Sequence, residues 1–158
     1  MDPSGRTDEK IARLASRSYG VVTRRQLLAA AISDQEIKGR RERGSLIAVH
    51  PGVYRVGHVA ASVEATYLAA VWACGTGALL MGDAAAYLYA LIKGPPPKPV
   101  VKTRTERRIK GIETHRTRGR QPGTEWKGIP ITTVPATLID LTPSMPEPEL
   151  AKATSRSP

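Results

Sequence analysis

The stretch that decides the fold is TRRQLLAAAISDQEIKGRRERGSLIAVHPGVYRVG, residues 23–57. It contains two pairs of residues with the spacing of a capping box. Thr23 precedes Gln26 by three residues, and the same spacing separates Ser33 from Glu36. In a capping box, each of the two side chains accepts a hydrogen bond from a backbone amide that the first turn of the helix leaves unpaired. Two consecutive helices are therefore predicted to begin here.

The second of these helices, expected over about residues 34–43, is strongly basic. The first covers about residues 24–30, and the second is expected to end at Gly44, a residue suited to the left-handed position past a helix end. Its one clear core residue is Ile37, and its basic residues are Lys38, Arg40, Arg41 and Arg43. A helix this short and polar is stable only against neighbours, so its long basic side chains are expected to point outward.

A β-hairpin is predicted after the basic helix. Residues 46–49 and 53–56 are apolar runs with strand character, and the turn-forming residues 50–52 separate them.

A further helix is predicted upstream, over about residues 8–18. Ile11, Leu14 and Ala15 fall on one face of it and could close a three-helix core. The order helix, helix, basic helix and hairpin is that of a winged helix-turn-helix, and we assign it to residues 8–57. A helix of this kind enters the major groove of DNA.

The charge is distributed as a polyanion partner would require. The formal net charge is +10; residues 1–60 hold 11 Lys/Arg against 6 Asp/Glu, and residues 94–128 hold 10 against 3. The segments 61–93 and 129–158 each carry a net charge of −1. Two basic blocks thus flank an apolar centre, a pattern typical of proteins that bind nucleic acid.

Candidate DNA contacts follow from the expectation that Ile37 faces the core. Asp34, Gln35 and Lys38 then face the DNA; a glutamine can pair with adenine, and a lysine can reach the acceptors of guanine. The predicted phosphate contacts are Arg24, Arg25, Arg40, Arg43 and Arg55. Ser33 is expected to divide its hydroxyl between capping and a phosphate. Arg41 is expected at an inward position from which its charge must reach solvent.

The rest of the chain predicts an α+β fold, in which a small mixed α/β domain over residues 61–142 follows the winged helix. Helices are expected over about residues 61–74 and 83–92, the second capped by Asp83, and the proline-rich residues 94–99 act as a stiff connector. Short strands are expected at 100–103, 109–115 and 129–133, then a helix from 134, and 143–158 is expected to be a frayed or truncated tail.

A second basic surface is predicted on this domain, formed by Lys102, Arg104, Arg107, Arg108, Arg116 and Arg118. It suits contacts to phosphates, and it could equally bind RNA or an acidic protein.

Other functional classes find little support in the sequence. Cys74 is the single cysteine, and with His50, His58 and His115 scattered there is no zinc spacing, so neither a metal nor a cofactor is expected. We expect no enzyme, because the acidic residues Asp83, Glu106, Glu113, Glu125 and Asp140 lie in unrelated contexts. No secretory signal or membrane span is evident, and a cytoplasmic protein is expected.

The chain resembles the AbiEi-type antitoxins of type IV toxin-antitoxin operons over roughly residues 8–142. In the first region the resemblance rests on Gly20-Val21-Val22-Thr23, Leu27-Leu28, Ile32-Ser33, Ile37, Gly44, Leu46 and His50-Pro51-Gly52-Val53-Tyr54. Further along, it rests on Ala73-Cys74-Gly75, Ala78-Leu79-Leu80, Gly128-Ile129-Pro130-Ile131-Thr132-Thr133 and Thr137-Leu138-Ile139-Asp140-Leu141.

This resemblance implies a winged helix that binds inverted repeats upstream of its own operon and represses it. It also implies a following domain that opposes a nucleotidyltransferase-like toxin. The chain departs from the family pattern in having Arg41 where a leucine is usual and Ala136 where an arginine is frequent. The alternatives are a toxin-binding or RNA-binding module without sequence-specific DNA recognition, or a small nuclease. The pattern does not give the oligomeric state.

Overall fold

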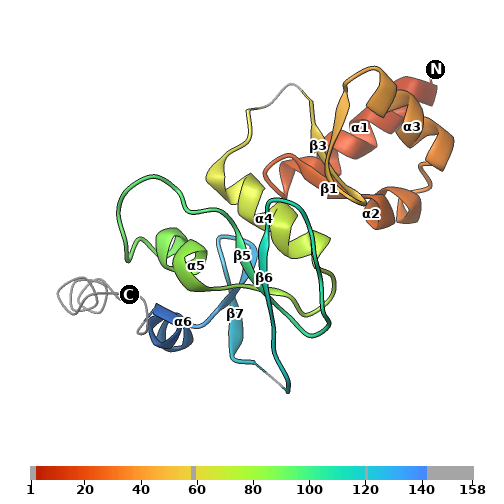
Figure 1. Ribbon diagram of the computed structural model, residues 1–158. Helices are drawn as coiled ribbons and strands as arrows, with labels where there is room; N and C mark the ends of the chain where they lie inside the picture. Colours follow the sequence, from red (N-terminus) through yellow and green to blue (C-terminus); the bar gives the residue numbers. More distant parts are fainter. Residues whose placement is uncertain (1–2, 58–59, 120, 142–158) are drawn as a thin grey trace. The chain divides into compact units, whose positions relative to one another are not determined.

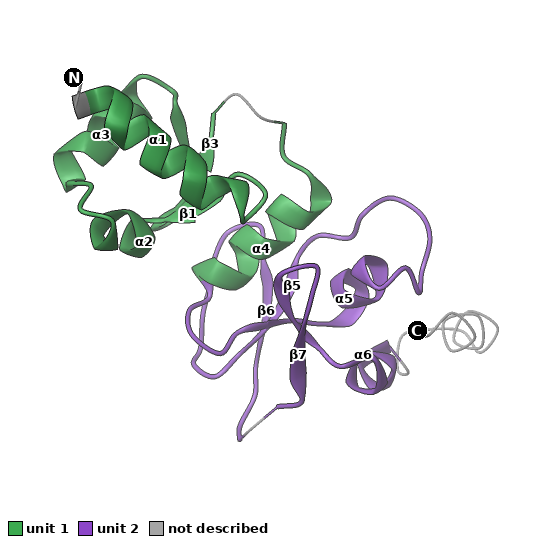
Figure 2. Ribbon diagram, turned by 180° about the vertical axis from the view of Figure 1, so that it is seen from behind, with its two compact units in different colours: residues 1–73 green, residues 74–158 purple. Residues whose placement is uncertain are grey.

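The computed structural model describes residues 3–57, 60–119 and 121–141 (Figure 1). The chain divides into two compact units, residues 1–73 and residues 74–158, and each has its own sheet (Figure 2). The predicted tail over residues 143–158 lies outside the described residues.

The first unit has its helices and strands in an order consistent with a winged helix-turn-helix. They are α1 (Pro3–Ser16), β1 (Val21–Thr23), α2 (Arg24–Ala29), α3 (Asp34–Glu42), β2 (Leu46–His50), β3 (Val53–Val56) and α4 (Val63–Ala73). The strands form an antiparallel sheet in the order β1-β3-β2, in which the β2–β3 hairpin is the expected wing. Strand β1, only three residues long, was not anticipated from the sequence.

Both predicted capping boxes form. The Thr23 hydroxyl accepts a hydrogen bond from the Gln26 amide at 3.1 Å, and the Gln26 side chain accepts one from the Thr23 amide at 3.0 Å. Ser33 and Glu36 make the corresponding pair of hydrogen bonds, each 3.2 Å long. The chain turns after α3 at Gly44, whose φ of +78° is a conformation that glycine adopts without strain.

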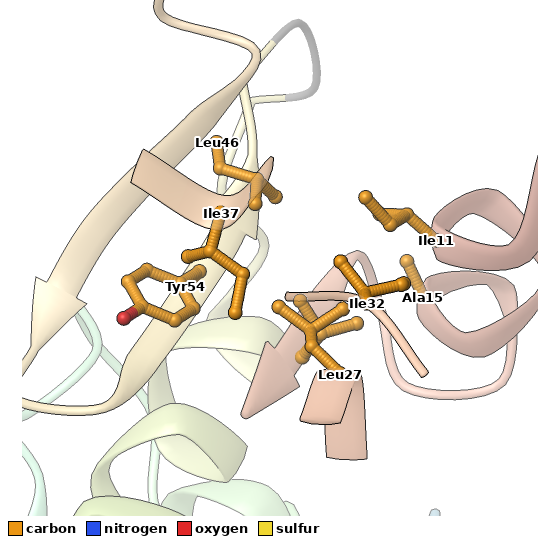
Figure 3. Close-up of a cluster of buried hydrophobic side chains, with 8 residues drawn as sticks. Ile11, Ala15, Leu27, Ile32, Ile37, Leu46 and Tyr54 are labelled. Carbon is orange, nitrogen blue, oxygen red and sulfur yellow. The ribbon is translucent and has the colours of Figure 1, made fainter. Parts of the chain in front are cut away.

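The core of the first unit lies between the three N-terminal helices and one face of the sheet (Figure 3). Its buried side chains are Ile11, Ala15, Val22, Leu27, Ile32, Ile37, Leu46 and Tyr54. The predicted anchors Ile11 and Ala15 on α1 and Ile37 on α3 are among them. Burying such residues supplies most of the stability that helices of this length lack by themselves.

Helix α4 covers the other face of the same sheet. Because neighbouring residues of a strand point to opposite faces, Val22 enters the main core while Val21 packs with Val53, Ala65 and Ala69 in a second core. We expected this helix to begin the second domain at residue 61, but the contacts place the division after Ala73. An apolar helix gives no sign in its sequence of which sheet it will cover.

The second unit is a five-stranded mixed sheet with two helices. Its elements are β4 (Leu79–Leu80), α5 (Gly82–Leu88), β5 (Val100–Thr103), β6 (Glu113–Arg116), β7 (Gly123–Trp126), β8 (Ile129–Thr132) and α6 (Val134–Leu141). The strand order is β6-β5-β4-β8-β7, with β5–β6 and β4–β8 parallel and the other pairs antiparallel. Leu80, Val101, Ile129 and Ile131 are fully buried in its centre. The predicted fold class, a winged helix followed by a small α/β unit, is confirmed.

Local predictions for the second unit need several corrections. Strands β4 and β7 were not anticipated from the sequence, and helix α5 ends at Leu88, short of the expected residue 92. Helix α5 begins at Gly82 after Met81, and Asp83 lies in its first turn without capping it. The strand expected over residues 109–115 is shorter, because Gly111 has a φ of +84° in a turn and pairing with β5 begins only at Glu113.

Candidate nucleic-acid interface

Helix α3 presents a polar face to solvent. Asp34, Gln35, Lys38, Arg41 and Glu42 are exposed along it, whereas Ile37 and Arg40 are buried. The structure thus places the three predicted base-contacting residues, Asp34, Gln35 and Lys38, on the accessible side of the helix.

Arg40 is not on that face, and this corrects its prediction as a phosphate contact. Its side chain is 4% exposed, and Nε forms an ion pair with Asp8 of α1 at 2.9 Å. The guanidinium also donates to the backbone oxygens of Ser4 at 3.2 Å and Glu36 at 3.3 Å. Arg40 follows Ile37 by three residues and therefore shares its inward face. Its role is to fasten α3 to α1.

Arg41 takes the opposite position from the one expected. It is exposed, and its guanidinium carbon lies 5.7 Å from the centre of the Tyr54 ring, within the range of a cation–π contact. Tyr54 belongs to the wing, so Arg41 joins α3 to the hairpin. Sequence reasoning missed this pairing because Tyr54 was assigned only to a strand of the predicted hairpin and was given no partner.

Two predicted DNA contacts are paired with each other. Arg24, the first residue of α2, makes a two-pronged ion pair with Asp34, the first residue of α3, with both nitrogen–oxygen distances 2.8 Å. The hydrogen bond from Arg24 lowers the pKa of the Asp34 carboxyl and raises the pKa of Arg24 itself. Both side chains are at least half exposed, so a phosphate that bound Arg24 would compete with Asp34 for it.

The Ser33 hydroxyl is committed to the helix cap. It accepts from the Glu36 amide and donates to Glu36 Oε1 at 3.1 Å. A hydroxyl has one proton to donate, so it has none left for a phosphate, which corrects the expected double role. Glu36 also accepts a hydrogen bond from Thr7 of α1 at 2.8 Å, and this bond is the main reason that the pKa of Glu36 is lowered.

The remaining basic candidates of the first unit stay accessible. Arg25 and Arg43 are exposed, and Arg55 on β3 is partly exposed. Anchor residues of α1, Ser4, Thr7 and Asp8, were not anticipated as partners of α3. The sequence offered one sign of this contact: Asp8 on the first helix is acidic, and Arg40 lies on the same helix face as Ile37.

The structure removes one residue, Lys102, from the predicted second basic surface. Arg104, Arg116 and Arg118 line one concavity of about 520 Å³, and Arg107, Arg108 and Arg116 line a second of about 390 Å³. Lys102 is not part of this exposed surface, because its residue is 8% exposed and its side chain points toward Gln121 and Asp140. Lys102 lies on β5, where every residue is buried.

The described residues offer few other candidate functional groups. No group of three or more His, Cys, Asp or Glu side chains that could hold a metal ion occurs among the residues described. Cys74 is buried, and burial raises the pKa of its thiol. None of the described helices combines the length and the apolar character needed to cross a membrane.

A family comparison agrees with the arrangement of the first unit. Residues 9–57 match the family model described as "Transcriptional regulator, AbiEi antitoxin", which confirms the resemblance drawn from the sequence. The match covers α2, α3 and the wing and ends before α4. A search of curated proteins found no match to the chain.

Proposed function

We propose that this protein, as a regulator of the kind that its N-terminal segment matches, is a transcriptional autorepressor that binds inverted repeats upstream of its own operon. One observation carries the proposal. A polar helix, capped at its start and fastened to α1 by Arg40, turns an accessible face with Gln35, Lys38 and Arg41 outward inside the segment that matches a regulator family. Such a helix suits the major groove of double-stranded DNA.

The residues have separable roles in this proposal. Gln35 and Lys38 read base edges, and a good two-pronged contact of this kind is worth about 1–3 kcal/mol of discrimination. Arg25, Arg43 and Arg55 bind phosphates and add affinity without sequence preference. Arg24 exchanges Asp34 for a phosphate, which frees the Asp34 carboxylate at the start of α3 to approach a base.

The test is fluorescence anisotropy of a labelled duplex from upstream of the gene, compared with a scrambled duplex, over a salt series. The wild type is compared with Lys38→Ala and Gln35→Ala. Lys93→Ala is the matched control, since it removes one exposed lysine from the second unit. We expect Lys38→Ala and Gln35→Ala to lose preference for the upstream duplex, while Lys93→Ala keeps it.

Two results would count against the proposal. Equal, weak binding to both duplexes would rule out sequence-specific repression and favour a toxin-binding or RNA-binding module. Equal loss of affinity in Lys93→Ala and Lys38→Ala would show that binding depends on net charge rather than on α3.

We further propose that the protein is the antitoxin of its operon and opposes a nucleotidyltransferase-like toxin. The support is the family match, whose description includes the antitoxin role. Co-expression of a neighbouring nucleotidyltransferase gene with and without this chain tests it. Restored growth in the presence of the chain is expected, and continued growth arrest at equal protein levels would refute it.

A further inference from the structure

The second unit contains a funnel lined by cationic and hydroxyl groups. Its wide mouth is the concavity of about 520 Å³ lined by Arg104, Arg116, Thr117, Arg118 and Gly119. Arg104, Thr117 and Gly119 also line a narrow pocket of about 30 Å³, whose other lining residues are Gly77, Leu79, Lys102, Thr103 and Gln121. The narrow pocket therefore continues from the mouth, and Lys102 is the charged residue that belongs to it alone.

Lys102 has weak partners for a buried ammonium. Its side chain is 10% exposed, Nζ lies 3.4 Å from Gln121 Oε1, and the nearest carboxylate oxygen, on Asp140, is 3.8 Å away. Charge-assisted hydrogen bonds between an ammonium and a carboxylate are normally about 2.7–2.9 Å long. A buried charge is stabilised only by close, hydrogen-bonded partners, so an anion in the narrow pocket would supply what Asp140 and Gln121 do not.

The arginines at the mouth also lack counter-charges. In the part of the chain that the structure describes, Arg104, Arg116 and Arg118 form no ion pair, whereas their neighbour Arg108 lies 3.8 Å from Glu106. Three unpaired guanidiniums around one concavity repel one another, and a multivalent anion between them would remove that repulsion.

The mouth is held in place before any ligand arrives. Arg104 lies against Gly77, where a Cβ atom would be 2.9 Å from its Nε, so a side chain there would displace it. The Thr103 hydroxyl donates to the Thr105 carbonyl at 2.7 Å, and the Thr117 amide donates to the Thr103 carbonyl at 2.8 Å. These bonds fix the backbone on both sides of Arg104, which lowers the entropy lost on binding.

We propose that this funnel binds the terminal phosphate of a small phosphorylated ligand, with the phosphate in the narrow pocket near Lys102 and the arginines around the rest of the molecule. Arginine and lysine side chains are donors that recognise phosphate oxygens. Among the residues that the structure describes, no carboxylate lines either part of the funnel. The taper favours a terminal phosphate over the backbone of a nucleic acid, because a phosphodiester is substituted on two sides and would stay at the mouth.

Isothermal titration of the full chain with inorganic pyrophosphate at physiological salt tests the proposal, and sulfate is the control for simple charge attraction. Arg118→Ala removes one exposed donor from the mouth, and Arg108→Ala, an exposed arginine outside the funnel, is its matched control. We expect one pyrophosphate per chain, binding weakened about tenfold or more in Arg118→Ala, and little change in Arg108→Ala. Lys102→Met is expected to abolish binding, and its circular dichroism spectrum shows whether it folds.

Four results would overturn the proposal. Sulfate binding as tight as pyrophosphate, or equal effects of Arg118→Ala and Arg108→Ala, would mean non-specific attraction. A folded Lys102→Met that binds like the wild type would exclude the narrow pocket. Finally, a dinucleotide without a terminal phosphate that binds as well as the same dinucleotide carrying one would assign the surface to nucleic-acid backbone instead. DNA binding through α3 is measured separately and does not depend on these outcomes.

Discussion

Replacing Arg40 separates a structural role from a DNA-binding one. Its guanidinium donates to the backbone oxygens of Ser4 and Glu36 and pairs with Asp8, which is itself 61% exposed. Because water can solvate Asp8, the ion pair adds less than about 1 kcal/mol. The buried methylenes of the side chain contribute about 0.8 kcal/mol each. We therefore expect Arg40→Ala to lower the free energy of unfolding by about 3 kcal/mol, and Arg40→Met, which keeps the apolar stem, by about 1 kcal/mol.

Urea denaturation measures these changes. Trp72 of α4 packs against the second core of the first unit and reports its unfolding, and a Trp126→Phe background removes the other tryptophan. Arg43→Ala is the matched control, because that exposed arginine lies three positions further along the chain and is expected to change stability by less than about 0.5 kcal/mol.

DNA binding supplies the decisive second measurement. A phosphate contact contributes about −0.9 to the slope of log affinity against log salt. We expect Arg40→Met to leave that slope unchanged and Arg43→Ala to make it shallower by about that amount. The reasoning fails if Arg40→Met keeps the stability of the wild type and loses one unit of slope, since Arg40 would then contact the DNA.

Three further outcomes are expected. Because the pKa of Glu36 is lowered in the folded protein, its contribution to stability is complete above the unfolded pKa of about 4.3 and is lost as the pH falls through the folded pKa. Glu36→Gln should therefore flatten the curve of stability against pH below about pH 4.3 in acid unfolding. An unchanged curve would contradict this. Gly57→Ala should destabilise the first unit by more than about 2 kcal/mol in urea, because a Cβ there would lie 2.0 Å from the Gly44 carbonyl oxygen, and wild-type stability would disprove it. Buried Cys74 should react with a thiol reagent only after unfolding; rapid labelling of the native protein would show that the site opens.

Local signals gave correct predictions in the first unit. The two capping boxes fixed where α2 and α3 begin, because a cap is made by residues three positions apart and needs no distant partner. The turn at Gly44 and the hairpin around residues 50–52 are local for the same reason. The family resemblance was drawn from motifs over roughly residues 8–142, and it was confirmed over residues 9–57.

Predictions that depended on distant partners were less accurate. A nine-residue helix with one apolar anchor, Ile37, leaves its rotation uncertain by about one residue, and we therefore assigned Arg40 outward and Arg41 inward, the reverse of what the structure has. The correct rotation depends on Asp8 and on Tyr54. Similarly, Lys102 was predicted as part of an exposed basic surface, but all four residues of its strand are buried.

The two-sided burial of the β1-β3-β2 sheet has a practical consequence for fragments of this protein. A piece that ended at residue 57, where the family match stops, would lack α4 and leave Val21 and Val53 facing water on a short sheet. An exposed apolar sheet face of this kind is prone to aggregation. The smallest piece that keeps both faces of the sheet covered extends to Ala73, so a deletion series or a fusion to a reporter should place its junction after α4 and before the second unit.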